Sequence, residues 1–405
     1  MTVDIRSLAE DELPELRRIT SYAFADSRSD EERRSLPDPL RPEWTTCAFV
    51  DGRLATTFGA YPFGVRLNGA AVPMAGVTAV ATLPEFRRRG LLRQVMTRSF
   101  GEQRERGQSL AILWASLGAI YQRYGYGLAS THASYRIDPR DARFNDPSPA
   151  SGRVRLMDAA EARSHLEAIY KAFARPRNLM LHRAPAMWDF RLTATGQQRP
   201  QVGVYFDPAG EARGYVVFTV KPDPEIGFGR SQHASVSDFA YLDPEALRGL
   251  WDFFAAHDLV REVVWQQVPE DDPVPHLLAE PNELQRRTGA AIWMRVTDVE
   301  EALRQRPYGE DGALSIRVVD PLCDWNAGVF GIETAGGATE VTRAGGEGDV
   351  TVSVAALAVL LAGHRSATQL ARAGLVAGGD DDDKALGVAD RLFATAFAPW
   401  CPDGF

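Results

Sequence analysis

One segment, residues 77–98, limits the possible folds more than any other part of this sequence. It begins with an apolar, β-branched run of strand character that stops at Pro84, and a basic turn containing Gly90 follows. A helix N-terminus favours negative charge, and a glycine lets the backbone approach a ligand closely. Arg87 and its neighbours add side-chain cations, so the segment predicts a phosphate-binding turn at the start of a helix. The residues that recur at helical spacing after the turn are Leu91, Leu92, Val95 and Met96.

The composition is that of an ordinary globular protein with more than one domain. The chain has 405 residues, of which 45% are hydrophobic and 24% charged. Its net charge of −9 argues against nucleic-acid binding and favours cationic small-molecule partners. No apolar stretch reaches the ~18 residues of a membrane span, and the N-terminus has no signal-peptide character. We therefore expect a cytoplasmic protein without membrane association.

The cysteines and histidines predict neither disulfides nor a metal site. Cys47, Cys323 and Cys401 are far apart in the sequence, and the seven histidines are scattered without metal-ligand spacing. The default expectation is an enzyme that works without a metal.

The first part of the chain alternates strands and helices. Strands are predicted at residues 3–8, 46–50, 54–58 and 109–115, and helices at 10–24 and 119–124. The dipeptides Asp51-Gly52 and Asn68-Gly69 are strong signals for hairpin turns. This order predicts an α/β domain that contains the phosphate-binding turn.

The middle of the chain repeats the first part. Residues 154–173 repeat the strand and helix of residues 5–24, and residues 236–245 repeat the strand that precedes the phosphate turn. The basic cluster itself is missing, because Ala246-Leu247-Arg248-Gly249 stands in its place. We interpret the chain as two copies of one fold, of which the second is a degenerate, structural copy.

The pattern changes after about Gly289. Strands are predicted at 291–296 and 314–319, a glycine-rich turn at 345–348, and helices at 353–361 and 367–375. This indicates a third domain of α+β type. The predicted boundaries are 1–140 for the first domain, 141–289 for the second and 290–405 for the third.

Two motifs carry a resemblance to a known family. They are Phe86-Arg87-Arg88-Arg89-Gly90-Leu91-Leu92-Arg93 and Ser116-x-Gly118-x-Ile120-Tyr121-x-Arg123-Tyr124-Gly125-Tyr126-Gly127. With Ala174-Arg175-Pro176, Trp188 and the chain end at Phe405, the sequence resembles the enhanced-intracellular-survival (Eis) family of GNAT N-acetyltransferases over essentially its whole length. Leu92 departs from the general GNAT pattern but is normal in that family.

The resemblance implies a fold, an activity and an assembly. The fold would be tandem GNAT-like domains, the second degenerate, followed by a sterol-carrier-protein-like α+β domain. The activity would be transfer of acetyl from acetyl-CoA, a co-substrate, to amines, notably aminoglycosides. The chain would assemble as a homo-oligomer, a hexamer.

The resemblance also implies the residues that hold the co-substrate. Val80, Ala81 and Thr82 would contact the acetyl and pantetheine portion through the backbone, with N–H groups aimed at the thioester oxygen. Ser116 and Leu117 would contact it again. The residues implied for the pyrophosphate are Arg88, Arg89, Gly90, Leu91, Leu92 and Arg93.

Two catalytic groups follow from the same resemblance. Tyr121 matches the general acid, since a phenol with an ordinary pKa of about 10 can donate a proton to the departing thiolate. The α-carboxylate of Phe405 would be the general base toward the substrate ammonium. Such a carboxyl is a weak base in water, so it would need burial or an intervening water. Tyr126 is assigned to packing.

Recognition of the acceptor stays open between alternatives. Asp26 and Asp403 are candidate anions for a cationic amine, or ordinary loop and turn residues. Phe24, Trp44 and Trp400 are candidate aromatic walls, or core residues. The acceptor could instead be a protein lysine or a polyamine. A non-catalytic CoA- or lipid-binding module is a further alternative, and it would need a continuous apolar tunnel in the third domain.

Overall fold

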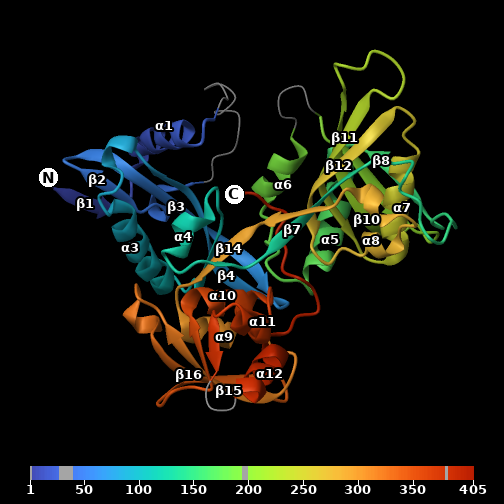
Figure 1. Ribbon diagram of the computed structural model, residues 1–405. Coiled ribbons are helices and arrows are strands. Elements are labelled where there is room, and N and C mark those ends of the chain that lie inside the picture. The colour runs from blue at the N-terminus through green and yellow to red at the C-terminus, as the bar shows by residue number, and fades with distance from the viewer. Residues whose placement is uncertain (1, 27–39, 194–198, 379–381) are drawn as a thin grey trace. The chain divides into compact units, whose positions relative to one another are not determined.

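The computed structural model describes residues 2–26, 40–193, 199–378 and 382–405 (Figure 1). The chain divides into two compact units. One consists of residues 1–130 and 291–405, and the other of residues 131–290. The second unit is therefore inserted, along the chain, between two parts of the first.

The first unit contains a sheet with the strand order β1-β2-β3-β4-β5-β14-β6. Neighbouring strands run antiparallel, except that β4 and β5 run parallel. The predicted hairpin turns form, and Asp51 and Asn68 adopt the left-handed φ angles of 47° and 46° that such turns require. The strands are β1 (Val3–Arg6), β2 (Cys47–Val50), β3 (Arg53–Leu67), β4 (Ala70–Thr82), β5 (Leu110–Trp114), β6 (Gly127–Leu128) and β14 (Ile292–Val296).

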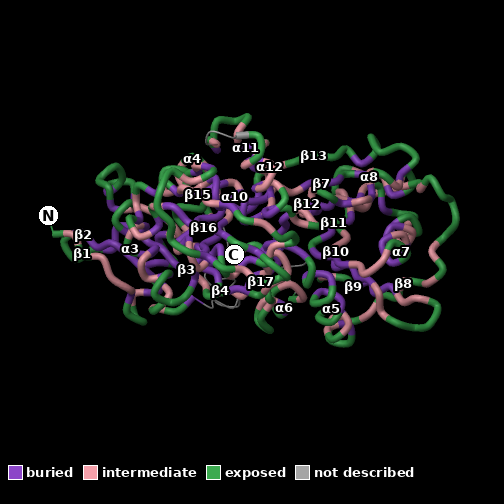
Figure 2. The backbone as a smooth tube through the Cα atoms, turned by 90° about the horizontal axis from the view of Figure 1, so that it is seen from below, coloured by how far each residue is buried: buried purple, intermediate pink, exposed green. Residues whose placement is uncertain are grey.

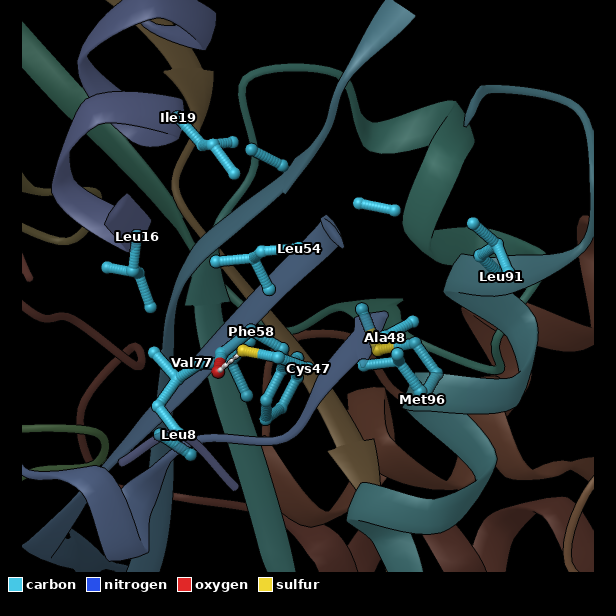
Figure 3. Packing of buried hydrophobic residues seen from close by; sticks show 14 of the residues in the cluster. Leu8, Leu16, Ile19, Cys47, Ala48, Leu54, Phe58, Val77, Leu91 and Met96 are labelled. Carbon is cyan, nitrogen blue, oxygen red and sulfur yellow. Dashed lines mark hydrogen bonds between the residues drawn. The ribbon is translucent and has the colours of Figure 1, made fainter. Parts of the chain in front are cut away.

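Amphipathic helices cover this sheet, as the apolar spacing predicts. They are α1 (Leu13–Ala23) and α3 (Leu91–Glu105). The short α4 (Gly118–Gln122) has no buried residue. Leu16 and Ile19 of α1 and Met96 of α3 are at most 4% exposed. Figure 3 shows these side chains together with Phe58 and Val77 of the strands. Each large apolar side chain buried in this way contributes about 1.5–3 kcal/mol, so the core holds the phosphate turn in a fixed frame.

A second sheet of the same unit, with the order β17-β16-β15-β18-β19, belongs to the C-terminal part. Helix α10 is buried along most of its length, and a Cβ on Gly127 of β6 would meet the Ala355 carbonyl oxygen at 2.2 Å. Figure 2 shows that buried residues follow the strands and that connecting loops are largely exposed. The elements are β15 (Gly312–Val319), β16 (Gly328–Ala335), β17 (Ala338–Ala344), β18 (Val350–Ser353), β19 (Val376–Gly378), α9 (Val299–Gln305), α10 (Val354–Ala362), α11 (Ala367–Arg372) and α12 (Asp382–Phe393).

The inserted unit has a sheet with the order β13-β7-β12-β11-β10-β9-β8. It reproduces the parallel pair of the first sheet, with β11 and β12 in the places of β4 and β5. Its elements are β7 (Thr131–Ile137), β8 (Arg153–Met157), β9 (Gln201–Phe206), β10 (Ala212–Pro222), β11 (Gln232–Tyr241), β12 (Val260–Pro269), β13 (Arg287–Ala290), α5 (Ala159–Ala174), α6 (Pro185–Leu192), α7 (Pro244–Ala255) and α8 (Val274–Leu277).

The two copies exchange a strand. The strand predicted at 291–296 forms as β14, but it pairs antiparallel with β5 of the first sheet rather than within the C-terminal sheet. In return, β7 follows the first copy in sequence and pairs antiparallel with β12 of the inserted sheet. The division at 1–140, 141–289 and 290–405 remains a proposal about domains, and both of its boundaries fall next to these exchanged strands.

Candidate active site

Strand β4 separates from β5 before it reaches the predicted acetyl-binding residues. Among the described residues, the two strands pair only from Met74 opposite Leu110 to Gly76 opposite Ile112. β4 then continues to Thr82 and keeps its pairing with β3 alone. The backbone of Val80 therefore lies beside a gap in the sheet, where a ligand can be bound by main-chain groups.

A bulge turns this part of β4. Ala79 and Val80 together oppose one residue of β3, and Ala79 has a left-handed φ of 53°. Thr57 of β3 supports the bulge, because its Oγ1 donates a hydrogen bond to the Ala79 carbonyl oxygen at 2.7 Å. Thr57 was not predicted from the sequence, since it is one of several similar residues in its strand. The bulge is the local cause of the direction taken by Val80, Ala81 and Thr82.

The helix after the phosphate turn begins with an open N-terminus. Gly90 is the N-cap of α3 with φ of 75°, and within the described part of the chain no side chain caps this end. A Cβ at Gly90 would meet no atom within 4 Å, so the glycine is needed for its backbone angle and leaves open space beside it. The first-turn N–H groups, including those of Leu91 and Leu92, are thus available to an anion.

The arginines of this turn divide into two kinds. Arg87 Nε donates to the Thr82 carbonyl oxygen at 3.1 Å, and Arg89 Nη2 donates to the Glu85 carbonyl oxygen at 2.8 Å. These two stabilise the turn itself. Arg88 and Arg93 are exposed and, as far as the described residues go, form no hydrogen bond or ion pair. They are the side chains best placed to bind phosphate.

The inserted unit differs at the corresponding helix. The N-cap of α7 is Asp243, whose carboxylate accepts a hydrogen bond from Ala246 N at 2.8 Å. Arg213 Nε also donates to this carboxylate, at 2.9 Å. A protein carboxylate therefore occupies the position that an anionic ligand would take. This helix start cannot hold a phosphate in the same way.

Tyr121 lies in α4, close to the end of β5. Its ring packs against Tyr126 at 5.7 Å between centroids, with the planes at 70°. Burial, with a smaller contribution from Tyr124, raises the pKa of Tyr121 to about 12. The phenol is therefore protonated at neutral pH. Tyr126 is fully buried, in agreement with a packing role.

Ser116 and Leu117 lie at the N-terminal end of α4. Both are exposed, and Leu117 is the N-cap of the helix with 64% of its surface accessible. Trp293 of β14 packs closely against the start of α4. A Cβ on Gly118 would lie only 2.4 Å from Trp293 Cζ2, so only glycine fits here. The exchanged strand thus sets the position of Tyr121.

The end of the chain is held on the first sheet. Trp114, the last residue of β5, donates a hydrogen bond from Nε1 to the Asp403 carbonyl oxygen at 2.8 Å. The Phe405 ring contacts the Phe63 ring edge-to-face at 5.0 Å. Trp400 and Asp403 are only 1% exposed, so the tail is packed rather than loose. The structure thus holds Asp403 at the end of β5 and the Phe405 ring on Phe63 of β3. The sequence held one signal for this anchoring: Trp114 ends a buried strand, and the N–H of a buried tryptophan needs a hydrogen-bond acceptor.

The remaining candidates for acceptor recognition fall in different places. Asp26 is half-buried, Phe24 is 52% exposed and therefore not a core residue, and Trp44 packs edge-to-face on Tyr61 at 6.4 Å. Trp44 also lines a pocket of about 490 Å³ on the first sheet. The pocket shares Phe63 with the contact to the C-terminal residue. Its other lining residues include Glu43, Pro73, Arg106 and Gln108.

The described residues contain no group of three or more metal-ligand side chains, and no helix among them is long and apolar enough to cross a membrane. Cys47, Cys323 and Cys401 are buried free thiols. Burial raises the pKa of the Cys47 thiol to about 12, so it remains protonated and unreactive.

Comparison with known proteins identifies the domains of this chain and its relatives. Residues 4–129 and 179–296 match acetyltransferase (GNAT) domains, and residues 299–402 match a sterol carrier protein domain. An uncharacterized N-acetyltransferase of Streptomyces avermitilis is 32% identical over 414 residues, which cover 100% of both chains. N-acetyltransferase Eis of Mycobacterium tuberculosis is 28% identical over 420 residues, 98% of each chain.

Solved structures show the same fold over the whole chain. Eis1 from Mycobacterium abscessus covers 100% of both chains with a TM-score of 0.84 and 30% identity. A GCN5-related N-acetyltransferase from Anabaena variabilis covers 100% of both chains with a TM-score of 0.87 and 23% identity, which concerns the fold alone. The protein is thus an acetyl-CoA-dependent N-acetyltransferase built from GNAT and sterol-carrier folds. Within that class, the chain belongs to the Eis-like family of GNAT N-acetyltransferases.

Proposed function

We propose that the enzyme transfers acetyl from acetyl-CoA directly to an amine of a cationic, aminoglycoside-like acceptor in a ternary complex. The observation that carries this proposal is the anchoring of the C-terminal tail at the end of β5 and on β3, in the same compact unit as the sheet gap and Tyr121. The proposal joins this carboxylate, the Tyr121 phenol and the main-chain gap in one site.

The chain's own groups fit acetyl-CoA. The open N-terminus of α3, Arg88 and Arg93 suit the pyrophosphate, and the space beside Gly90 lets phosphate reach the backbone. The bulged backbone at Val80–Thr82 suits the acetyl and pantetheine portion. Its N–H groups would stabilise the negative charge that develops on the thioester oxygen.

The reaction then needs one base and one acid. The Phe405 carboxylate takes a proton from the acceptor ammonium, directly or through a water, and the freed amine attacks the thioester carbonyl. As the C–N bond forms and the C–S bond breaks, the nitrogen loses its second proton to water. Tyr121 donates its proton to the departing thiolate. Because the cysteine thiols are buried, the described residues offer no thiolate for a covalent acetyl-enzyme.

A cationic acceptor suits the surface beside the C-terminal residue. The 490 Å³ pocket that shares Phe63 with this site presents the Glu43 carboxylate and the Trp44 ring, which an acceptor ammonium would have to take over from Arg41, with Arg106 also in the lining. Carboxylates and aromatic faces both attract ammonium groups.

An acceptor panel tests the proposal. Purified protein would be incubated with acetyl-CoA and one amine at a time: an aminoglycoside, a polyamine or a lysine peptide. The release of free CoA thiol would be followed in each incubation. We expect the fastest release with aminoglycosides. Faster release with a lysine peptide or a polyamine would mean that the acceptor is a protein lysine or a polyamine rather than an aminoglycoside. No release with any amine would remove the catalytic proposal.

We also expect a cytoplasmic hexamer, and light scattering of the full chain tests the hexamer.

Gly90→Ala should raise the KM for acetyl-CoA about tenfold while kcat changes little. The substitution strains a left-handed residue, which costs about 1–2 kcal/mol, and places a methyl group where phosphate would approach. Gly107→Ala is the matched control, because Gly107 follows the other end of α3 with φ of 72° and equally open surroundings. Steady-state kinetics should show a raised KM for the first variant only. An equal rise in both variants would mean that strain on the helix, rather than phosphate contact, causes the effect.

A further inference from the structure

We propose that Arg295 of β14 is a positioning residue for the general acid, acting on Tyr121 from behind through Tyr126. This inference rests on the proposed catalytic role of Tyr121. It assigns a function in acetyl transfer to the strand that the chain contributes to the first sheet only after the inserted unit.

The guanidinium of Arg295 is fully buried and directed toward the turn that follows α4. A Cβ on Gly125 would meet Arg295 Nη1 at 2.8 Å, so this nitrogen lies directly beneath the Gly125 backbone. Nη2 points the other way and forms an ion pair with Asp320 at 2.5 Å. The Arg295–Asp320 pair is thus a buried dipole with its positive side toward Gly125 and Tyr126.

Two sets of atoms on that side lack partners. Within the described residues, Nε and Nη1 of Arg295 and the hydroxyl of Tyr126 are buried without a hydrogen bond. Both residues pack on the same ring, with Phe100 at 4.8 Å from Arg295 Cζ and at 6.2 Å from the Tyr126 ring. A buried donor without a hydrogen bond is costly, although the Phe100 ring offsets part of this cost for the guanidinium.

The negative side of the dipole is well satisfied. Asp320 accepts hydrogen bonds from Leu322 N at 3.1 Å, Cys323 N at 3.3 Å and Asn326 Nδ2 at 3.0 Å. Arg295 Nη2 also donates to Cys323 Sγ at 3.3 Å. Asp320 is therefore fixed in place, and the free end of the guanidinium is the end that faces the tyrosines.

Electrostatics connect this pair to Tyr126, whose ring contacts that of Tyr121, while the pKa of Tyr121 itself is raised by burial and by Tyr124. Burial raises the pKa of Tyr126 most, the neighbouring Tyr121 raises it further, and Arg295 opposes both effects. When Tyr121 gives its proton to the thiolate, the phenol O–H bond breaks, an S–H bond forms, and a phenolate remains until solvent returns the proton. A cation behind Tyr126 lowers the cost of that phenolate in a buried site.

Other charged and titratable groups face Tyr121 from its own turn. Tyr124 raises the pKa of Tyr121, and the nearby Arg93 and Arg123 in turn lower the pKa of Tyr124. Arg93 and Arg123 are exposed, so solvent screens their charges, whereas Tyr124 is half-buried and uncharged. Arg295 is buried, unlike Arg93 and Arg123, so its effect should be separable by mutation.

The test uses the full-length enzyme with a difluorotyrosine at position 121. This phenol is more acidic than tyrosine, so its ionisation enters the pH range in which the protein is folded. In this background, Arg295→Met should lower kcat about tenfold and move the alkaline limb of the pH–kcat profile upward by about one pH unit, since the phenolate loses a nearby cation. Arg295→Lys keeps the positive charge, so both kcat and the position of the alkaline limb should stay close to their values in the parent enzyme.

A double variant separates this role from a purely structural one. Arg295→Met leaves Asp320 without its partner, whereas Arg295→Met with Asp320→Asn removes the whole pair. We expect the double variant to keep the upward shift, although reduced in size. A wild-type profile in the double variant, or no shift in Arg295→Met, would overturn the inference. Tyr121→Phe with wild-type kcat would instead remove the proposed acid itself, a distinct failure.

Discussion

Converting the C-terminal carboxylate of Phe405 to an amide should slow acetyl transfer by about 10²–10⁴-fold while acetyl-CoA binding stays within about twofold of wild type. The amide keeps the size of the residue and its contact with Phe63 but cannot accept the ammonium proton. Semisynthesis by ligation of a C-terminal peptide ending in phenylalanine amide gives this variant, and ligation of the matching acid is the control. The measurement is amine-dependent release of CoA together with a binding titration of acetyl-CoA.

An extended chain provides an independent version of the same experiment. Two glycines appended after Phe405 move the carboxylate away from the end of β5, where Trp114 holds the Asp403 carbonyl oxygen. Phe405→Leu keeps the carboxylate in place and should retain most of the activity. If the amide and the extended chain both work at wild-type rates, the carboxylate is not the base, and another group must take the ammonium proton.

Tyr121→Phe should lower kcat by about 10²–10⁴-fold, with little change in the affinity for acetyl-CoA. The substitution removes only the phenol hydroxyl group, and the ring contact with Tyr126 is kept. Because burial raises the pKa of Tyr121 to about 12, the wild-type residue stays protonated up to about pH 10 and its ionisation should add no alkaline limb below that pH.

Tyr124→Phe is the matched control for this substitution. Tyr124 lies on the same turn, and burial also raises its pKa, but it has no proposed contact with the thiolate. Stopped-flow measurement of a single turnover separates the chemical step from product release. Equal losses in both variants would indicate a structural effect on α4 rather than the loss of an acid.

Local sequence predicted the parts of the fold that depend on neighbouring residues. The hairpin turns at Asp51-Gly52 and Asn68-Gly69 form because these residues tolerate left-handed angles. The helix after Gly90 begins where the apolar spacing begins, and the expected strand at 109–115 appears as β5, Leu110–Trp114. Such signals are short-range, so one sequence suffices to detect them.

Local sequence patterns do not show which strands pair with each other when they are far apart in the chain. The predicted short strands around residues 54–67 and 77–83 are parts of one long hairpin, β3 and β4, because alternation does not reveal how far a pair extends. Nothing local shows that β14 pairs in the first sheet or that Arg295 lies behind Tyr126. The bulge at Ala79 is equally hidden, since it depends on Thr57 across the strand. The catalytic candidates came from resemblance, and their surroundings came from the structure.

The most direct test of the account is an initial-rate study with acetyl-CoA and the acceptor amine both varied, combined with a search for labelled protein after incubation with radioactive acetyl-CoA alone. Direct transfer in a ternary complex predicts double-reciprocal plots that intersect and a protein that carries no label. Parallel lines together with a stoichiometrically acetylated enzyme would contradict the account, because they require a covalent intermediate that the buried thiols cannot provide.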